Sequence, residues 1–142
     1  MPNAKKIMSG KEKEGLIRKI SEIIGSKGHI LFAYVFGSFS TGERFRDIDV
    51  GIYVSDAARF ATIDAELALE TELEEACRVP VDVRIMNRAP VTFAYHILKS
   101  GRLLVDKDPS RRCDYEGLTY KEYFDVRHLR REYLREIVHA PV

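Results

Sequence analysis

The stretch Phe36–Val54, F-G-S-F-S-T-G-E-R-F-R-D-I-D-V-G-I-Y-V, decides the fold of this chain. Gly37 and Ser38 close one apolar run, and eight residues separate them from Asp47, which opens a second apolar run with Asp49. The second run alternates apolar and polar residues, which is the pattern of a half-buried β-strand. We therefore predict two strands joined by a polar turn, with both aspartates on the face of the second strand that carries no apolar side chains.

The flanking segments supply the rest of a small sheet and its helices. Apolar residues at helical spacing indicate helices over about 10–25, 55–77, 90–100 and 119–139. Ser9, Ser55 and Thr119 are the expected N-caps of three of them. Apolar runs and alternation indicate strands over 29–36, 47–54, 81–85 and 103–105, and residues 107–112 are expected to form a polar loop. This order predicts an α/β (α+β) fold, a small mixed sheet with helices packed mainly on one face.

The composition fits one domain over residues 1–142, with a core at about 10–106 and a carboxy-terminal helix at about 119–139. Lys and Arg number 23 against 22 Asp and Glu, so the charge does not favour a nucleic-acid substrate. No apolar run approaches the roughly 18 residues of a membrane span, and the polar first residues hold no signal-peptide core. The two cysteines form no disulfide framework. We expect a cytoplasmic protein that does not bind membranes.

Three carboxylates carry the candidate chemistry. Asp47 and Asp49 leave the same strand face about 6.6 Å apart, from a rise of ~3.3 Å per residue. Asp82 lies in the middle of the next predicted strand, and it meets the other two if these strands are neighbours. Mg²⁺ is commonly held by one or two carboxylates together with water and substrate phosphates. The set predicts a site for one or two Mg²⁺ ions, with Asp82 as a third ligand or as the general base for an attacking hydroxyl.

The Gly-Ser pair predicts a phosphate site beside these carboxylates. Gly37 lets the backbone approach a phosphate closely, and the Ser38 hydroxyl and the amides after it can donate to phosphate oxygens. Arg44, Arg46 and Arg84 are cations that can neutralise a triphosphate. Taken alone, an Asp-x-Asp pair is usually solvated or caps a helix, a Gly-Ser pair is usually a turn, and Arg84 can be a plain ion-pair partner. The ordered combination favours the nucleotide site.

Residues 33–54, A-Y-V-F-G-S-F-S-T-G-E-R-F-R-D-I-D-V-G-I-Y-V, resemble the signature of the polymerase-β-like nucleotidyltransferase superfamily. Residues 79–90, V-P-V-D-V-R-I-M-N-R-A-P, are also similar to its minimal members, the MNT proteins that pair with HEPN proteins as antitoxins. The resemblance covers about residues 15–106. It implies a nucleotidyltransferase fold, Mg²⁺ and a nucleoside triphosphate, usually ATP.

By position, the resemblance assigns phosphate binding to Gly37 and Ser38. It assigns the metal and catalytic carboxylates to Asp47, Asp49 and Asp82. The eight-residue loop between the two motifs is shorter than is common in the family. Arg46 stands in this loop where a small polar residue is common, and we expect it to contact the nucleotide.

The resemblance further implies transfer of AMP from ATP to a hydroxyl, which in HEPN-paired members is a tyrosine of the toxin. The expected partners are a nucleoside triphosphate and a HEPN-family protein, and the sequence leaves a homo-oligomer open. Two other functions stay open. One is adenylylation of a small hydroxylated molecule such as an aminoglycoside. The other is a non-catalytic antitoxin that binds its partner, for which the tyrosine-rich carboxy-terminal segment is a candidate surface; alternatively, that segment is a terminal helix packed on the domain.

Overall fold

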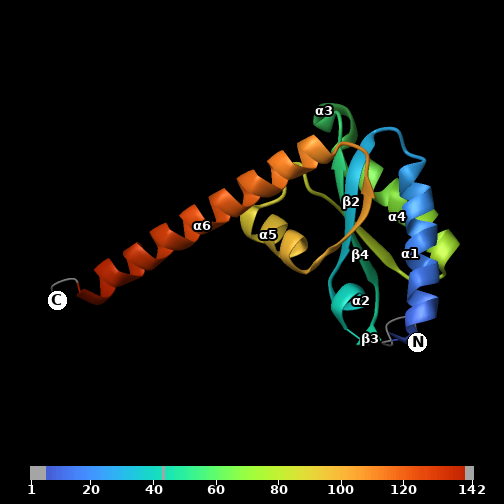
Figure 1. Ribbon diagram of the computed structural model, residues 1–142, viewed down its shortest axis with the longest axis horizontal. Helices are drawn as coiled ribbons and strands as arrows, with labels where there is room; N and C mark the ends of the chain where they lie inside the picture. The colour runs from blue at the N-terminus through green and yellow to red at the C-terminus, as the bar shows by residue number, and fades with distance from the viewer. Residues whose placement is uncertain (1–5, 43, 140–142) are drawn as a thin grey trace.

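The computed structural model describes residues 6–42 and 44–139, and its centre is a four-stranded mixed sheet (Figure 1). The strand order is β5-β4-β2-β6. The central strand β2 (Ile30–Phe36) pairs antiparallel with β4 (Ile48–Val54) and β6 (Arg102–Asp106), and β5 (Val81–Ile85) runs parallel to β4 at one edge. A separate two-stranded ribbon joins β1 (Lys6–Ile7) to β3 (Arg44–Phe45). The predicted mixed sheet is thus confirmed, while the first five residues lie outside the described part of the chain.

Two helices, α1 (Gly10–Gly25) and α4 (Ile63–Cys77), cover one face of the sheet (Figure 1). Ser9 caps α1 as predicted, because its hydroxyl accepts a hydrogen bond from the Glu12 amide at 3.2 Å. The apolar side chains of both helices meet the apolar sides of the strands in the main core. Its members include Ile20, Ile24, Val35, Val50, Ile52, Leu69, Leu73, Val81 and Val83. The prediction that helices pack mainly on one face holds for α1 and α4.

The opposite face of the sheet is covered in part by α5 (Val91–Ser100) and by the first turns of α6 (Pro109–His139). A second, smaller apolar cluster forms there, made of Phe32, Tyr34, Met86 and Ile97 with Tyr53 and Tyr115 beside it. At Gly51, an added Cβ would lie 3.0 Å from the Met86 sulfur and 3.4 Å from the Ile97 Cδ1, so α5 closes tightly on the middle of β4. The face that carries the strand aspartates is therefore half covered, and the end near Asp49 stays accessible to solvent.

The free edge of β5 is closed by carboxylates from α4. Three glutamates spaced four residues apart line one side of that helix, so they can reach successive backbone amides of the strand. Glu66, Glu70 and Glu74 accept hydrogen bonds from the N–H groups of Ile85, Val83 and Val81 at 3.2, 2.8 and 3.0 Å. An uncovered edge strand offers such N–H groups to other chains. Here the glutamates fix α4 to the strand that carries Asp82.

The single helix predicted from a Ser55 cap to about Cys77 is wrong, because the segment forms two helices, α3 (Ala57–Phe60) and α4. Asp56 caps α3 by accepting from the Arg59 amide at 3.3 Å, and Thr62 caps α4 by accepting from the Ala65 amide at 3.1 Å. Two polar caps so close together interrupt the helix even though the apolar spacing continues across them.

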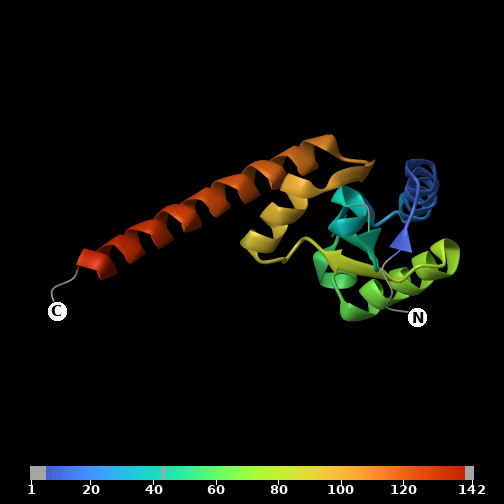
Figure 2. The ribbon, with the colours of Figure 1, turned by 90° about the horizontal axis from the view of Figure 1, so that it is seen from below.

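The carboxy-terminal helix begins earlier than predicted. The expected loop over 107–112 is wrong, because Asp108 caps a helix that starts at Pro109, accepting from the Arg111 amide at 3.1 Å. A proline at the first helical position loses no intrahelical hydrogen bond. Thr119 is therefore a buried residue inside α6 and not an N-cap. Beyond the domain, α6 projects outward as a single straight helix (Figure 1, Figure 2).

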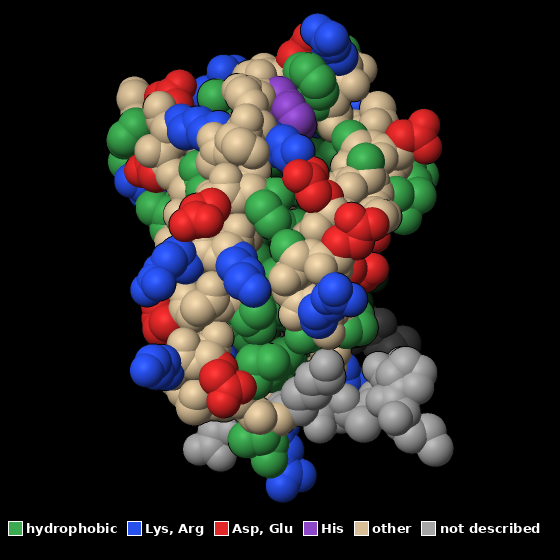
Figure 3. Space-filling model, turned by 90° about the vertical axis from the view of Figure 1, so that its right-hand side faces the viewer, with side chains coloured by type: hydrophobic (Ala, Val, Ile, Leu, Met, Phe, Trp, Pro, Cys, Tyr) green, Lys and Arg blue, Asp and Glu red, His purple; other side chains and the backbone are tan. Residues whose placement is uncertain are grey.

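The surface on the side of α1 and α4 mixes basic and acidic side chains over its whole extent (Figure 3). Hydrophobic side chains show between the charged ones, without a continuous basic area on the face in view. Within residues 6–42 and 44–139, none of the helices is both long and apolar enough to cross a bilayer.

Candidate active site

Asp49 and Asp82 lie side by side across the sheet. They are direct partners in the parallel register of β4 and β5, and neighbouring strands are about 4.8 Å apart, so both side chains leave the same face at the same level. Asp47 immediately precedes β4, and its charge, like that of Asp82, acts on the Asp49 carboxylate. The structure thus brings together the three aspartates that the sequence singled out.

The three carboxylates repel one another where they meet. Burial, and then the negative charges of Asp47 and Asp82, together raise the pKa of Asp49 to about 6, while the positive charge of Arg84 opposes them. Carboxylate oxygens are the ligands that Mg²⁺ prefers, and a divalent cation would offset this repulsion. The donor set therefore fits the predicted magnesium site in its chemistry.

The side chains of Asp47, Asp49 and Asp82 do not converge on a single point. Across the described residues, 6–42 and 44–139, we find no group of three His, Cys, Asp or Glu side chains arranged to hold one ion. The Asp82 Oδ2 lies 3.4 Å from the Arg84 Nε, in the plain ion pair that the sequence also allowed. This ion pair is made by one of the two carboxylate oxygens of Asp82.

The Gly-Ser pair lies directly against this cluster. Gly37 has φ +77° and ψ −160°, a backbone conformation that is almost confined to glycine, and an added Cβ would overlap the Asp49 Oδ2. Ser38 is exposed and begins the single-turn helix α2 (Ser38–Thr41), whose amides at Ser40 and Thr41 donate to the Gly37 carbonyl. Close approach of the backbone and the carboxylate therefore requires a glycine at position 37.

The predicted cations differ in their placement. Arg84 lies on β5 beside Asp82, and Arg46 is exposed in the bend just before Asp47. Arg44 is exposed on β3, at the far end of the same loop. All three stay predicted nucleotide contacts, and only Arg84 makes an ion pair with one of the three aspartates among the residues described.

A groove of about 510 Å³ shares Arg84 with the acid cluster, and the sequence did not point to it. Its lining residues are Glu66, Arg84, Ile85, Arg88, Ala89, Pro90 and Phe93. The Phe93 ring packs edge-on against Phe36, whose backbone is paired with Asp49. Arg88 and Phe93 come from the loop after β5 and from α5. No spacing in the sequence indicated that α5 would fold onto the aspartate face, so these residues were missed.

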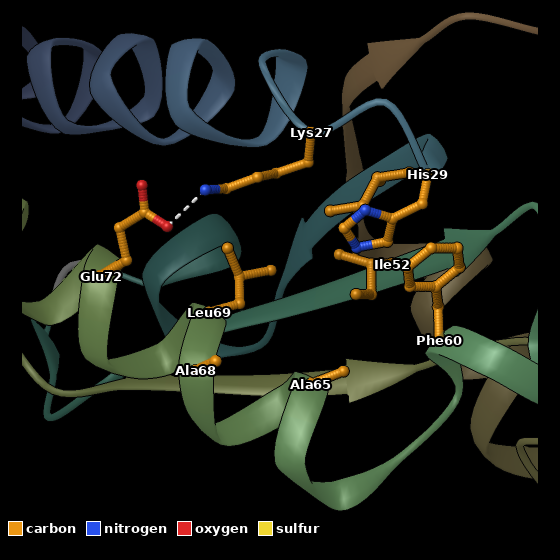
Figure 4. A pocket seen from close by; sticks show the side chains of 9 residues that line it. Lys27, His29, Ile52, Phe60, Ala65, Ala68, Leu69 and Glu72 are labelled. Carbon is orange, nitrogen blue, oxygen red and sulfur yellow. Dashed lines mark ion pairs between the residues drawn. The ribbon is translucent and has the colours of Figure 1, made fainter.

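A second hollow, of about 200 Å³, lies on the other face of the sheet (Figure 4). An ion pair of 2.6 Å between the Lys27 Nζ and the Glu72 Oε2 runs along it, and the His29 ring stacks on Phe60 at 4.2 Å. Ile52 lines this hollow and belongs to the core under α1 and α4, whereas Asp49 and Asp82 leave the face under α5. The sheet separates the hollow from the acid cluster, so it is not part of the candidate active site.

The protein is an α/β protein with a candidate metal and phosphate site at one end of its mixed sheet. The chain belongs to the polymerase-β nucleotidyltransferase family, because the family model for polymerase beta, nucleotidyltransferase, matches residues 18–110. The fold and family inferred from the motifs are thereby confirmed. Among curated proteins, no sequence gives a significant match.

Several solved structures share the fold. A chain of a toxin–antitoxin crystal structure with AMP-PNP superposes with a TM-score of 0.68 at 20% identity, covering 88% of this chain and 98% of that chain. A chain of the tri-AMPylated Shewanella oneidensis HEPN toxin in complex with MNT antitoxin gives 0.69 at 18% identity, covering 89% and 98%. A chain of the MntA-HepT toxin–antitoxin structure gives 0.65 at 17%, covering 90% and 98%. At these identities the likeness establishes the fold.

Proposed function

We propose that this chain is a Mg²⁺-dependent nucleotidyltransferase that moves AMP from ATP to a tyrosine hydroxyl of a HEPN-family partner, and so acts as an antitoxin. The observation that carries the proposal is the register of Asp49 and Asp82 on neighbouring strands, with Gly37 packed against the Asp49 carboxylate. Carboxylates beside a glycine turn suit a magnesium–triphosphate substrate.

One set of residues would bind the metal ions, and another would bind the phosphates. Asp47, Asp49 and Asp82 would hold one or two Mg²⁺ ions, and Gly37, Ser38 and Arg46 would bind the phosphates. When bound, Mg²⁺ neutralises phosphate charge and favours in-line displacement at the α-phosphate.

In the transfer step, the acceptor oxygen forms a bond to the α-phosphorus while the bond from that phosphorus to the bridging oxygen breaks. Pyrophosphate leaves with the electron pair of the broken bond. The hydroxyl proton passes to a carboxylate, for which Asp82 is the candidate general base. Arg84, within 3.4 Å of Asp82, orients that carboxylate before substrate binds.

Two observations support a protein acceptor. One structure with this fold is a complex in which a HEPN toxin has been tri-AMPylated. The groove next to Asp82 is open and is lined by two arginines and Phe93, which suits a protein segment that presents an aromatic hydroxyl. A small hydroxylated acceptor is the second candidate, since the same groove would also admit one.

The test uses ATP labelled at the α-phosphate, Mg²⁺, the full chain and its HEPN-family partner. Label on the partner that is lost in Asp49→Asn, and kept in the exposed control Asp64→Asn, supports the proposal. Label on a small hydroxylated molecule alone supports the second candidate. A stable complex without any label, unaffected by Asp49→Asn, would show a binding protein without catalysis.

A further inference from the structure

The first turns of α6 are fixed to the domain. The Arg112 Nε lies 2.8 Å from the Asp106 Oδ2, and the Tyr115 hydroxyl donates to the backbone carbonyl that follows β5 at 2.9 Å. The ring of Tyr123 stacks parallel on Tyr95 of α5 at 3.6 Å. Because Tyr115 packs in the cluster under α5, α6 leaves the domain on the same face of the sheet as Asp49.

Beyond Phe124, whose ring meets Tyr95 of α5 edge-on at 6.2 Å, the helix has no cover within the described chain. Every residue of 124–139, which we call the α6 arm, is exposed, and the arm spans about 24 Å at ~1.5 Å per residue. Both ribbon views show it projecting away from the sheet (Figure 1, Figure 2). An isolated helix of this length is only marginally stable in water, so we expect the apolar side chains of the arm to be covered by a partner surface.

The arm carries exposed apolar side chains on several sides, among them Leu129, Leu134 and Val138, and one row of positions, which we call the stripe, continues the side of α6 packed on the domain. Thr119 and Tyr123 face the domain, and further positions follow in alternate steps of three and four residues, the spacing of a single helix face. These positions are Val126, Arg130, Tyr133 and Ile137. Tyr133 is 63% exposed and Ile137 is 52% exposed. Large apolar side chains that gather on one surface and stay in water mark an interaction site.

The stripe does not suit a second copy of itself. Arg130 stands in its middle, so two arms paired about their centres, in either direction, would bring two guanidinium groups together. Opposed like charges at such a contact disfavour pairing. The arm holds four arginines, Arg127, Arg130, Arg131 and Arg135, against the three acidic residues Asp125, Glu132 and Glu136, an excess of one positive charge. Arginine prefers bidentate pairing with carboxylates.

We propose that the α6 arm is the docking element for the protein substrate, and that it binds an apolar helical face flanked by Asp or Glu side chains. The identity of that protein as a substrate rests on the proposed function. Because α6 leaves the domain on the aspartate side of the sheet, a partner docked on the arm would present its acceptor segment from the side that holds the groove of Arg88 and Phe93. Tethering of this kind raises the effective concentration of the acceptor at the site.

The test compares two neighbouring arginines in the full chain. Arg130→Glu reverses a charge within the stripe, and Arg131→Glu makes the same change about a quarter turn away from it. A double variant, Tyr133→Asp with Ile137→Asp, removes the apolar contact. All these side chains are exposed, and circular dichroism checks that the helix persists. Calorimetry gives the Kd for the HEPN-family partner, and a fluorescent ATP analogue with Mg²⁺ reports on the nucleotide site.

We expect Arg130→Glu and the double variant to weaken partner binding by about tenfold or more, and Arg131→Glu to stay within about twofold of the wild type. Nucleotide binding is unchanged in all three, and transfer falls through a higher KM for the partner. Equal Kd values in all variants would overturn the proposal, as would a self-association in sedimentation that the double variant abolishes. Tight, stripe-dependent binding without any AMP transfer would leave the docking in place and reject the proposed function.

Discussion

Replacing Gly37 by alanine should disable the candidate site and destabilise the fold together. The backbone at φ +77° and ψ −160° is nearly confined to glycine, and holding another residue there costs about 1–3 kcal/mol. The new methyl group would also overlap the Asp49 Oδ2 and push that carboxylate out of place. Urea unfolding should therefore show a loss of at least that size, and Mg²⁺-dependent AMP transfer should be lost even where the protein is fully folded.

A double-mutant cycle separates the two causes. In an Asp49→Ala background the overlap is gone, so Gly37→Ala should cost only the backbone strain, and the difference measures the steric part. Gly117→Ala is the control, because nothing lies within 4 Å of its added Cβ in the middle of α6, and it should stabilise the chain by up to about 1 kcal/mol. Wild-type stability and wild-type transfer in Gly37→Ala would refute the reasoning.

Three further predictions concern parts of the fold around the site. Glu70→Ala leaves the Val83 amide of the edge strand without its carboxylate acceptor and should lower the free energy of unfolding in urea by about 1–3 kcal/mol. The exposed control Glu75→Ala should change it little. Equal effects of the two changes would show that the edge contacts do not stabilise the sheet. Thr62→Ala removes the cap of α4 and should cost about 1 kcal/mol, and an unchanged unfolding midpoint would exclude this cap as a stabilising contact. Burial, and then the positive charges of nearby Lys and Arg side chains, lower the pKa of His29. Its contribution to stability is therefore complete above the unfolded-state pKa near 6.5 and is lost as pH falls below that value. Between pH 7.5 and 5.5, His29→Gln should lose less free energy of unfolding than the wild type, and parallel pH profiles would contradict this.

The strands and the aspartate cluster were predictable because they follow from local pattern. Strict alternation puts Asp49 on the polar face of β4, and the same alternation in V-D-V puts Asp82 on the polar face of β5. Their exact register was not visible in the sequence. The glutamates of α4 hold β5 from its free edge, and such tertiary contacts leave no local pattern in the sequence.

The parts that the sequence did not reveal depend on single polar contacts or on tertiary packing. The break before α4 comes from the Thr62 cap, and apolar spacing does not report a hydrogen bond. The early start of α6 comes from the cap at Asp108 and from Pro109 at the first helical position. In the sequence alone, this Asp-Pro pair is equally typical of a loop. The placement of Phe93 near the acids comes from α5 crossing the aspartate face, a choice between two faces that periodicity does not determine.

The most direct test of the central claim is a Mn²⁺ titration followed by electron paramagnetic resonance, with a non-hydrolysable ATP analogue present. Mn²⁺ replaces Mg²⁺ at oxygen-rich sites and is visible to this method. The wild type should bind the ion with the nucleotide, and Asp49→Asn and Asp82→Asn should each weaken binding by about tenfold or more, since either change removes a charged ligand. Equal Mn²⁺ affinity in the wild type and both variants would contradict a metal site built from these carboxylates.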